Sequence, residues 1–199
     1  MRGIVEAIST LLITGILIGV VGTVYFWGLP LIQKNKDISV LESTEDFMKE
    51  LNERVKLVAS AGGRETIQFN QPGIIKFEGT SINVILDTEG TIYAAESPVP
   101  LSRNGVSVES GVWGIDQPER ISVVANNLGD KRYRDTFDLR YIPLSVSSFS
   151  PKKEYFIQLD GTNSIGGQGS DVIITSEGTT EEPTQGGTRV SALVKIVID

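Results

Sequence analysis

The chain has 199 residues, no Cys, no His and a formal net charge of −7. These absences exclude disulfides, thiolate or imidazole metal sites and the commonest general base, so catalysis is disfavoured and no cofactor or metal site is expected. The acidic balance, without a basic stripe, excludes nucleic acid as an expected partner.

Residues 7–33 form an apolar run. No charged residue occurs between Glu6 and Lys34, and most positions are Ile, Leu, Val or Gly. Because about 20 apolar residues span a bilayer, residues 5–29 are expected to form a membrane-spanning helix. The run is longer than the apolar part of a secretory signal, and no small-x-small cleavage site follows it, so an uncleaved anchor is the better interpretation.

A short basic leader precedes this run. Arg2 and Gly3 are followed by Ile4 and, two positions later, Glu6, within the sequence MRGIVEAISTLL. This start resembles the class III signal of archaeal type IV pilins and archaellins. The resemblance implies that a prepilin peptidase cuts between Gly3 and Ile4, that the precursor lies in the membrane, and that the mature chain forms a homo-oligomeric helical filament.

Glu6 has two readings. A carboxylate near a helix N-terminus is favoured by the helix dipole and by the unpaired N–H groups there, which needs no special role. The resemblance adds a role in subunit register or in presenting the leader to the peptidase.

Small residues punctuate the apolar run. Gly15, Gly19 and Gly22 recur on one helix face, where they let neighbouring helices approach closely, although Gly is also simply common in membrane helices. Gly28 and Pro30 then predict a kink or a short melted stretch at the membrane boundary.

An amphipathic helix is expected next. Ser43 or Thr44 is its expected N-cap, and Gly62 and Gly63 stop it. One apolar face, which we expect to pack on the following domain, consists of Val40, Thr44, Phe47, Leu51, Val55 and Val58.

Past Gly63, short β-rich runs alternate with turn signals such as Pro72-Gly73 and Asn104-Gly105. They predict an antiparallel sandwich or barrel. Two stretches are expected to be irregular, Asn163–Ser170 as a structured loop and Ser176–Thr188 as a mobile hairpin tip. The predicted strands are Thr66–Phe69, Ile74–Phe77, Ile82–Asp87, Thr91–Ala95, Val106–Val108, Arg120–Val124, Phe137–Tyr141, Tyr155–Leu159, Val172–Ile174 and Arg189–Ile198.

The sequence thus predicts an α+β protein: a long, kinked N-terminal hydrophobic helix followed by an antiparallel β-sandwich head. The expected parts are a leader (residues 1–3), a core helix with its amphipathic extension (4–62) and the head (63–199). The favoured function is a non-enzymatic, adhesive archaeal pilin displayed on the cell surface. Three alternatives stay open: a minor or archaellum-like accessory pilin, a single-span surface-binding protein, and an anchored enzyme.

Overall fold

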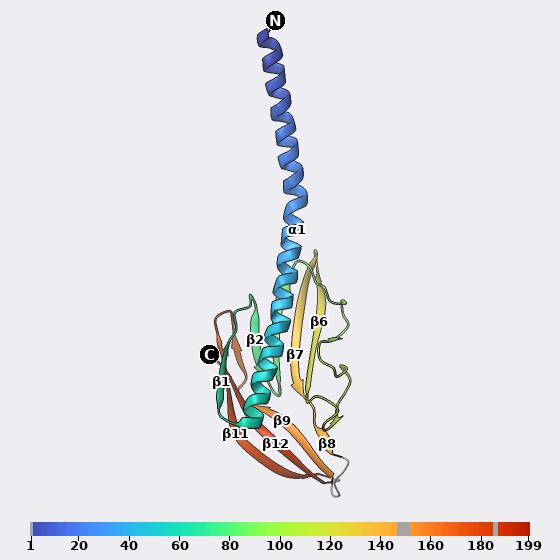
Figure 1. The fold of residues 1–199 in the computed structure, drawn as a ribbon, viewed down its shortest axis with the longest axis vertical. Helices are drawn as coiled ribbons and strands as arrows, with labels where there is room; N and C mark the ends of the chain where they lie inside the picture. Colours follow the sequence, from blue (N-terminus) through green and yellow to red (C-terminus); the bar gives the residue numbers. More distant parts are fainter. Residues whose placement is uncertain (1, 147–151, 185–186) are drawn as a thin grey trace.

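The computed structural model describes residues 2–146, 152–184 and 187–199, with side chains from Ile8 onward. One helix, α1, covers Arg2–Ala61 and is about 90 Å long at 1.5 Å per residue. Its first half projects beyond the rest of the molecule, and its second half lies against a β-rich head domain, residues 63–199 (Figure 1). The chain is therefore an α+β protein with one long apolar helix.

The helix runs without interruption through Gly28 and Pro30, so the melted stretch expected there is absent. Pro30 has no N–H and leaves only the carbonyl of Phe26 without its usual helical partner. Intact turns on both sides preserve the remaining bonds, and α1 is a single, gently curved rod (Figure 1).

The second half of α1 buries one face. Along this face, Leu41, Met48, Leu51, Val55 and Val58 are completely buried, which confirms the predicted stripe and adds two residues to it. The expected N-cap is wrong because the helix does not begin again at this point. Instead, the Thr44 hydroxyl donates to the carbonyl of Val40, 2.8 Å away, inside a continuous helix.

The helix stops at the predicted glycine pair. Gly62 and Gly63 have φ values of +75° and +90°, a region that glycine adopts without strain. The Gly62 N–H still donates to the carbonyl of Val58, whereas the carbonyl of Gly63 already accepts from Ser176 in the sheet. The pair thus turns the chain from helix into strand.

Two six-stranded sheets make up the head domain. The first has the order β1-β11-β12-β9-β8-β5, and the second has the order β10-β2-β3-β7-β6-β4. Their strands are β1 (Arg64–Gln68), β2 (Ile74–Glu78), β3 (Ser81–Thr88), β4 (Val99–Pro100), β5 (Gly111–Val112), β6 (Glu119–Gly129), β7 (Arg132–Tyr141), β8 (Leu144–Val146), β9 (Lys152–Asp160), β10 (Ser164–Gly166), β11 (Asp171–Thr184) and β12 (Gly187–Ile198).

The first sheet is mixed, not purely antiparallel as predicted. β12 pairs parallel to β9, and β5 pairs parallel to β8. The remaining pairs in both sheets are antiparallel. Parallel strands need a long connection between them. The short turn signals in the sequence do not show which distant strands such connections bring together.

Two predicted strands are loops. Within Thr91–Ala95, only Ala95 forms a bridge, to Ala125. The side chains of this loop bond to two other elements, Thr91 to Asp135 on β7 and Tyr93 to Glu45 on α1. Val106–Val108 closes a turn in which the Val108 N–H donates to the carbonyl of Gly105.

The stretch Ser176–Thr188, predicted as a mobile tip, instead lies mostly in β11 and β12. A register shift between Ser176 and Gly178 allows β11 to continue to Thr184. The hairpin's residues 185–186 lie outside the described part. Within Asn163–Ser170, the expected loop contains the short strand β10.

Both sheets and the helix share one apolar core. The rings of Phe47 on α1 and Phe69 after β1 meet edge to face at 5.3 Å. Phe77 and Phe137 bring the second sheet into the same cluster. This shared core fixes the second half of α1 to the head.

Leu51→Ala tests this attachment. It should lower the free energy of unfolding by about 2–5 kcal/mol because it leaves a cavity in the core. Leu57→Ala, on the exposed side of the same helix, should change that free energy by less than about 0.5 kcal/mol. Urea unfolding of the full chain in detergent, followed by circular dichroism, measures both. Equal effects of the two substitutions would contradict the packing.

Candidate anchoring and assembly helix

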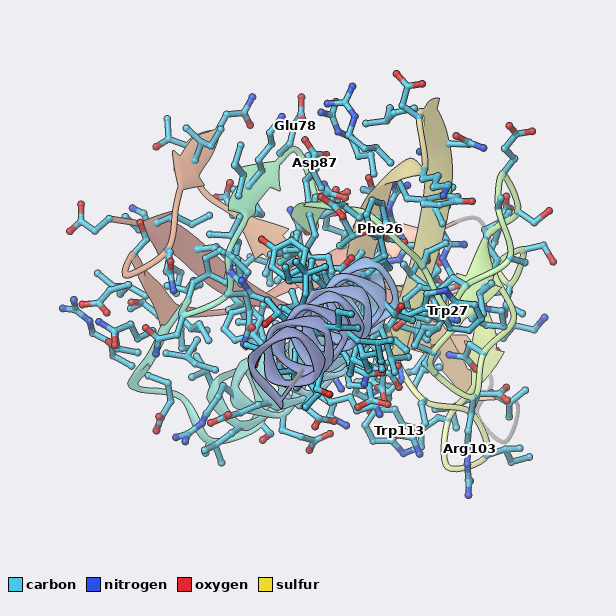
Figure 2. The ribbon with its side chains drawn as sticks, turned by 90° about the horizontal axis from the view of Figure 1, so that it is seen from above. Phe26, Trp27, Glu78, Asp87, Arg103 and Trp113 are labelled. Carbon is cyan, nitrogen blue, oxygen red and sulfur yellow. The ribbon has the colours of Figure 1, made fainter. Side chains whose placement is uncertain are left out.

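The apolar segment of α1, residues 8–32, is not covered by any other described part of the chain. Its large apolar side chains are exposed by 48% at Leu29 to 83% at Phe26. Phe26 and Trp27 are the most exposed of them, at 83% and 82%, and Figure 2 labels both in a view down the helix onto the head. A continuous apolar surface of this size marks a contact with a membrane or with protein.

The dimensions of this segment match a bilayer. The helix is long and apolar enough to cross a membrane, and none of its most apolar stretch is buried. The 25 residues of the segment rise about 37 Å, against about 30 Å for the hydrocarbon core. Tyr25, Phe26 and Trp27 stand near its end, followed by Lys34 and Lys36, an order typical of a membrane interface.

Two threonine hydroxyls inside the apolar segment are internally satisfied. The hydroxyl of Thr14 donates to the carbonyl of Thr10, and the hydroxyl of Thr23 donates to the carbonyl of Gly19, each at 2.8 Å. Hydroxyls paired in this way can enter hydrocarbon without an unsatisfied donor. The segment therefore suits an apolar environment on all sides.

The predicted small face is open. A Cβ built on Gly15, Gly19 or Gly22 meets nothing within 4 Å. Gly22 also lies in a shallow groove of about 420 Å³ whose other lining residues are Leu17, Ile18, Val21, Tyr25 and Phe26. No described residue packs against these three positions, so the described part of the chain gives no steric reason for glycine there.

The processing residues of the sequence analysis lie in the first turns of α1. Arg2, Gly3, Ile4 and Glu6 belong to the helical backbone. Their side chains lie outside the described part, and the two readings of Glu6 both remain predictions.

A buried carboxylate marks the point where α1 enters the head. Asp37 is only 6% exposed. It accepts a hydrogen bond from the side-chain amide of Gln33 at 2.9 Å, and its other oxygen accepts one from the backbone N–H of Glu89 at 3.0 Å. This contact ties the helix to the loop after β3 and so fixes the direction in which the apolar segment leaves the head.

A second polar cluster lies beside this contact. Asp135 on β7 is fully buried and accepts from the hydroxyls of Thr88 and Thr91, at 2.9 and 2.8 Å. Tyr93 donates to Glu45 of α1 and packs edge to face on Phe137. Burial raises the pKa of Asp135, and the nearby Asp37 and Asp87 raise it further, although the two threonines oppose them.

Sequence reasoning missed these junction residues. Asp37 directly follows Lys36 and carries no motif of its own. A signal was nevertheless present, because Asp37 lies four residues after Gln33 and seven before Thr44, on the face that turns toward the head.

Comparison of the chain with protein-family models, with curated proteins and with solved structures gave no match. A functional proposal therefore depends on the residues and geometry of this chain alone.

Substituting Gly19→Leu separates folding from assembly. Because an added side chain at Gly19 meets no atom of this chain, the stability of the head should not change. Self-association of the full chain in detergent should weaken by about tenfold, since close helix approach is lost. Sedimentation equilibrium measures this association, with Val20→Leu as the control on a neighbouring face. Unchanged association of the Gly19 variant would contradict a packing role for the small face.

The pKa shift of Asp135 predicts a pH effect. A raised folded-state pKa stabilises the fold below the unfolded-state value of about 3.9, and this contribution is lost as pH rises through the folded-state pKa. Asp135→Asn should therefore gain stability relative to wild type between pH 4 and pH 7. Urea unfolding at a series of pH values measures the difference.

Asp87→Asn is the matched control for this effect. A hydrogen bond from Arg134 lowers the pKa of Asp87, so its stabilising contribution is present at neutral pH and lost on acidification. That variant should lose stability relative to wild type as pH rises, by a small amount because the ion pair is exposed. Trends of the same sign for both variants would contradict the assignment.

Proposed function

We propose that this chain is the structural subunit of an archaeal type IV pilus-like filament. The observation that carries the proposal is the apolar segment of α1, which is exposed along its whole length and fixed to a folded head. A helix of this kind needs lipid before assembly and other subunits after it. The two sheets, packed as a sandwich around the end of α1, would coat the outside of the filament.

Processing is the second part of the proposal. A prepilin peptidase removes Met1–Gly3, and Ile4 becomes the new N-terminus. The support is the sequence start, with its basic residue and glycine directly before an apolar helix. In this scheme, Glu6 lies at the third position of the mature chain, where its carboxylate favours the helix N-terminus.

Transfer from membrane to filament is physically reasonable. The same apolar surface can exchange lipid contacts for helix contacts, because packing and dispersion replace those made by acyl chains. The hydroxyls of Thr14 and Thr23 keep their backbone partners in either surrounding. Gly15, Gly19 and Gly22 then give neighbouring helices room to approach.

The filament reading is preferred to an anchored enzyme or a tethered binding protein. The chain has neither His nor Cys, which removes the commonest catalytic side chains. A tethered binding protein needs only one membrane span and gives no reason for a cleavable basic leader. In the proposed arrangement, the acidic head faces the outside of the cell and contacts surfaces there.

The experiment is the recovery of sheared filaments from an archaeal host that expresses the chain. The protein should be a dominant filament component, with an intact mass and N-terminus that begin at Ile4. A chain that retains Met1–Gly3 and is found only in membranes would overturn the proposal.

Gly3→Val provides the matched variant. A β-branched residue before the cleavage point should block the peptidase, so unprocessed precursor should accumulate in membranes and filaments should be lost. Gly15→Ala, which changes a glycine of the same helix by one methyl group, should still be processed. Filaments built from uncleaved Gly3→Val chains would show that processing is not required.

A further inference from the structure

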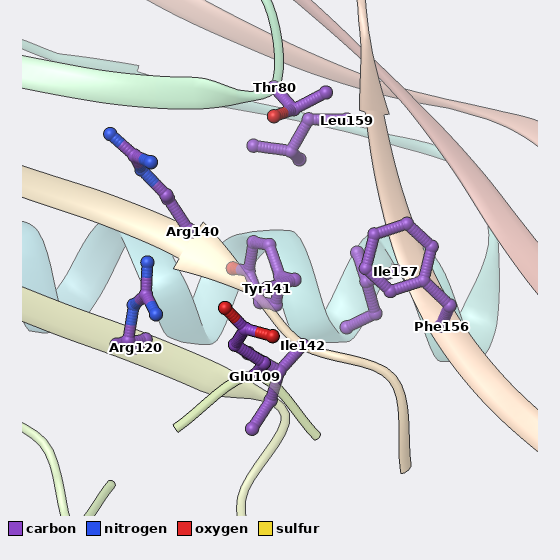
Figure 3. A pocket seen from close by; sticks show the side chains of 9 residues that line it. All are labelled: Thr80, Glu109, Arg120, Arg140, Tyr141, Ile142, Phe156, Ile157 and Leu159. Atoms are coloured by element: carbon purple, nitrogen blue, oxygen red, sulfur yellow. The ribbon is translucent and has the colours of Figure 1, made fainter. Parts of the chain in front are cut away.

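A pocket of about 190 Å³ opens on the head domain, at the ends of β6, β7 and β9 (Figure 3). It is larger than the roughly 10–15 Å³ that one water molecule needs, and smaller than the ~300 Å³ at which most drug-sized sites begin. Its lining residues are Thr80, Glu109, Arg120, Arg140, Tyr141, Ile142, Phe156, Ile157 and Leu159.

Two guanidinium groups meet at this pocket. Arg120 on β6 and Arg140 on β7 are direct cross-strand partners. Both lie on the face opposite the core-facing residues Ile121 and Leu139, so their side chains emerge together. Figure 3 shows both guanidinium groups on the same side of the pocket. Like charges placed opposite each other are unfavourable unless an anion balances them.

Arg120 has no ion-pair partner within the described residues, although the charge of Asp138 acts on it at longer range. Its one hydrogen bond runs from Nη1 to the carbonyl of Val108, at 3.1 Å. Its Nε–H is buried and has no partner. No carboxylate of the described residues lies within 4 Å of this guanidinium, and the undescribed stretches 147–151 and 185–186 contain no acidic residue. A buried, unpaired N–H on a cation calls for an acceptor.

The neighbouring acids do not supply that acceptor. Asp138 pairs with Arg140, at 2.7 Å, and so neutralises one of the two cations. Glu109 lines the pocket from an exposed loop but forms no ion pair with Arg120. Arg120 therefore keeps an N–H without an acceptor, and Arg140 places a second, partly balanced positive charge beside it.

The opposite wall of the pocket is apolar. Phe156, Ile157 and Leu159 lie across from the two arginines in Figure 3. A ligand that fills the pocket must therefore present an acceptor on one side and an uncharged, apolar body on the other. The arginine fork matches a planar carboxylate, with which it forms paired hydrogen bonds.

We propose that this pocket binds a small organic acid, with its carboxylate on Arg120 and Arg140 and its apolar body against Phe156, Ile157 and Leu159. The assignment concerns the head domain alone and does not depend on the filament proposal.

Sodium benzoate is a suitable probe. Added to the full chain in detergent micelles, it should shift the backbone amide signals of Arg120, Arg140 and Ile142 saturably, with a Kd on the order of 1 mM. Benzamide, which has the same ring without the charge, and inorganic phosphate, which has charge without the ring, should each bind at least about tenfold more weakly. Binding of phosphate as tight as that of benzoate would indicate an adventitious ion only and overturn the assignment.

Variants locate the binding. Arg120→Gln should abolish the benzoate shifts, whereas Arg103→Gln, which removes the same charge from an exposed position elsewhere in the head, should leave them unchanged. Glu109→Gln should strengthen binding because it removes a repelling carboxylate. If Arg120→Gln fails to fold, the half-exposed Arg140→Gln serves instead and should weaken binding. Unchanged binding in a folded arginine variant would contradict the site.

Discussion

A bare apolar surface on the first half of α1 is the constraint on which the rest of the structure depends. Its large apolar side chains, from Ile8 to Ile32, are left uncovered by the described residues, although transfer of such a surface from water is strongly favourable. No soluble monomer could keep it exposed without associating. Lipid and neighbouring helices are the two environments that satisfy it, and the proposed function uses them in succession.

The contacts between α1 and the head fix the direction of the apolar segment relative to the head. The core contacts of Leu51 and Val55 hold the second half of the helix, and Asp37 ties the turn at which it leaves. Continuity through Pro30 means that one rod extends from the apolar segment to the core of the head. A head fixed in this way would occupy a defined orientation around any bundle formed by the apolar segments.

Periodicity and composition predicted the parts of the structure that local forces decide. The buried stripe with Phe47 and Val58, the stop at Gly62 and the long strands of the head all follow from side-chain pattern and backbone freedom. Parallel pairing of β9 with β12, by contrast, depends on contacts between distant segments, which local patterns do not encode. The helix also continues through Pro30, where the sequence predicted an interruption. Proline removes one helical hydrogen bond, and the many intact bonds on both sides outweigh that loss. The arginine pair of the pocket also needed the β6–β7 register before Arg120 and Arg140 could be placed together.

Because the natural chain has no cysteine, single cysteines can report directly whether the apolar segment is covered. The measurement is labelling of Ile18→Cys and Glu50→Cys with a membrane-impermeant maleimide, on cells and on sheared filaments. Covered helices should leave Cys at position 18 unreactive in both samples, while Cys at the exposed position 50 reacts in both. Rapid labelling of position 18 in filaments would contradict the claim that this surface is the one on which the subunits assemble.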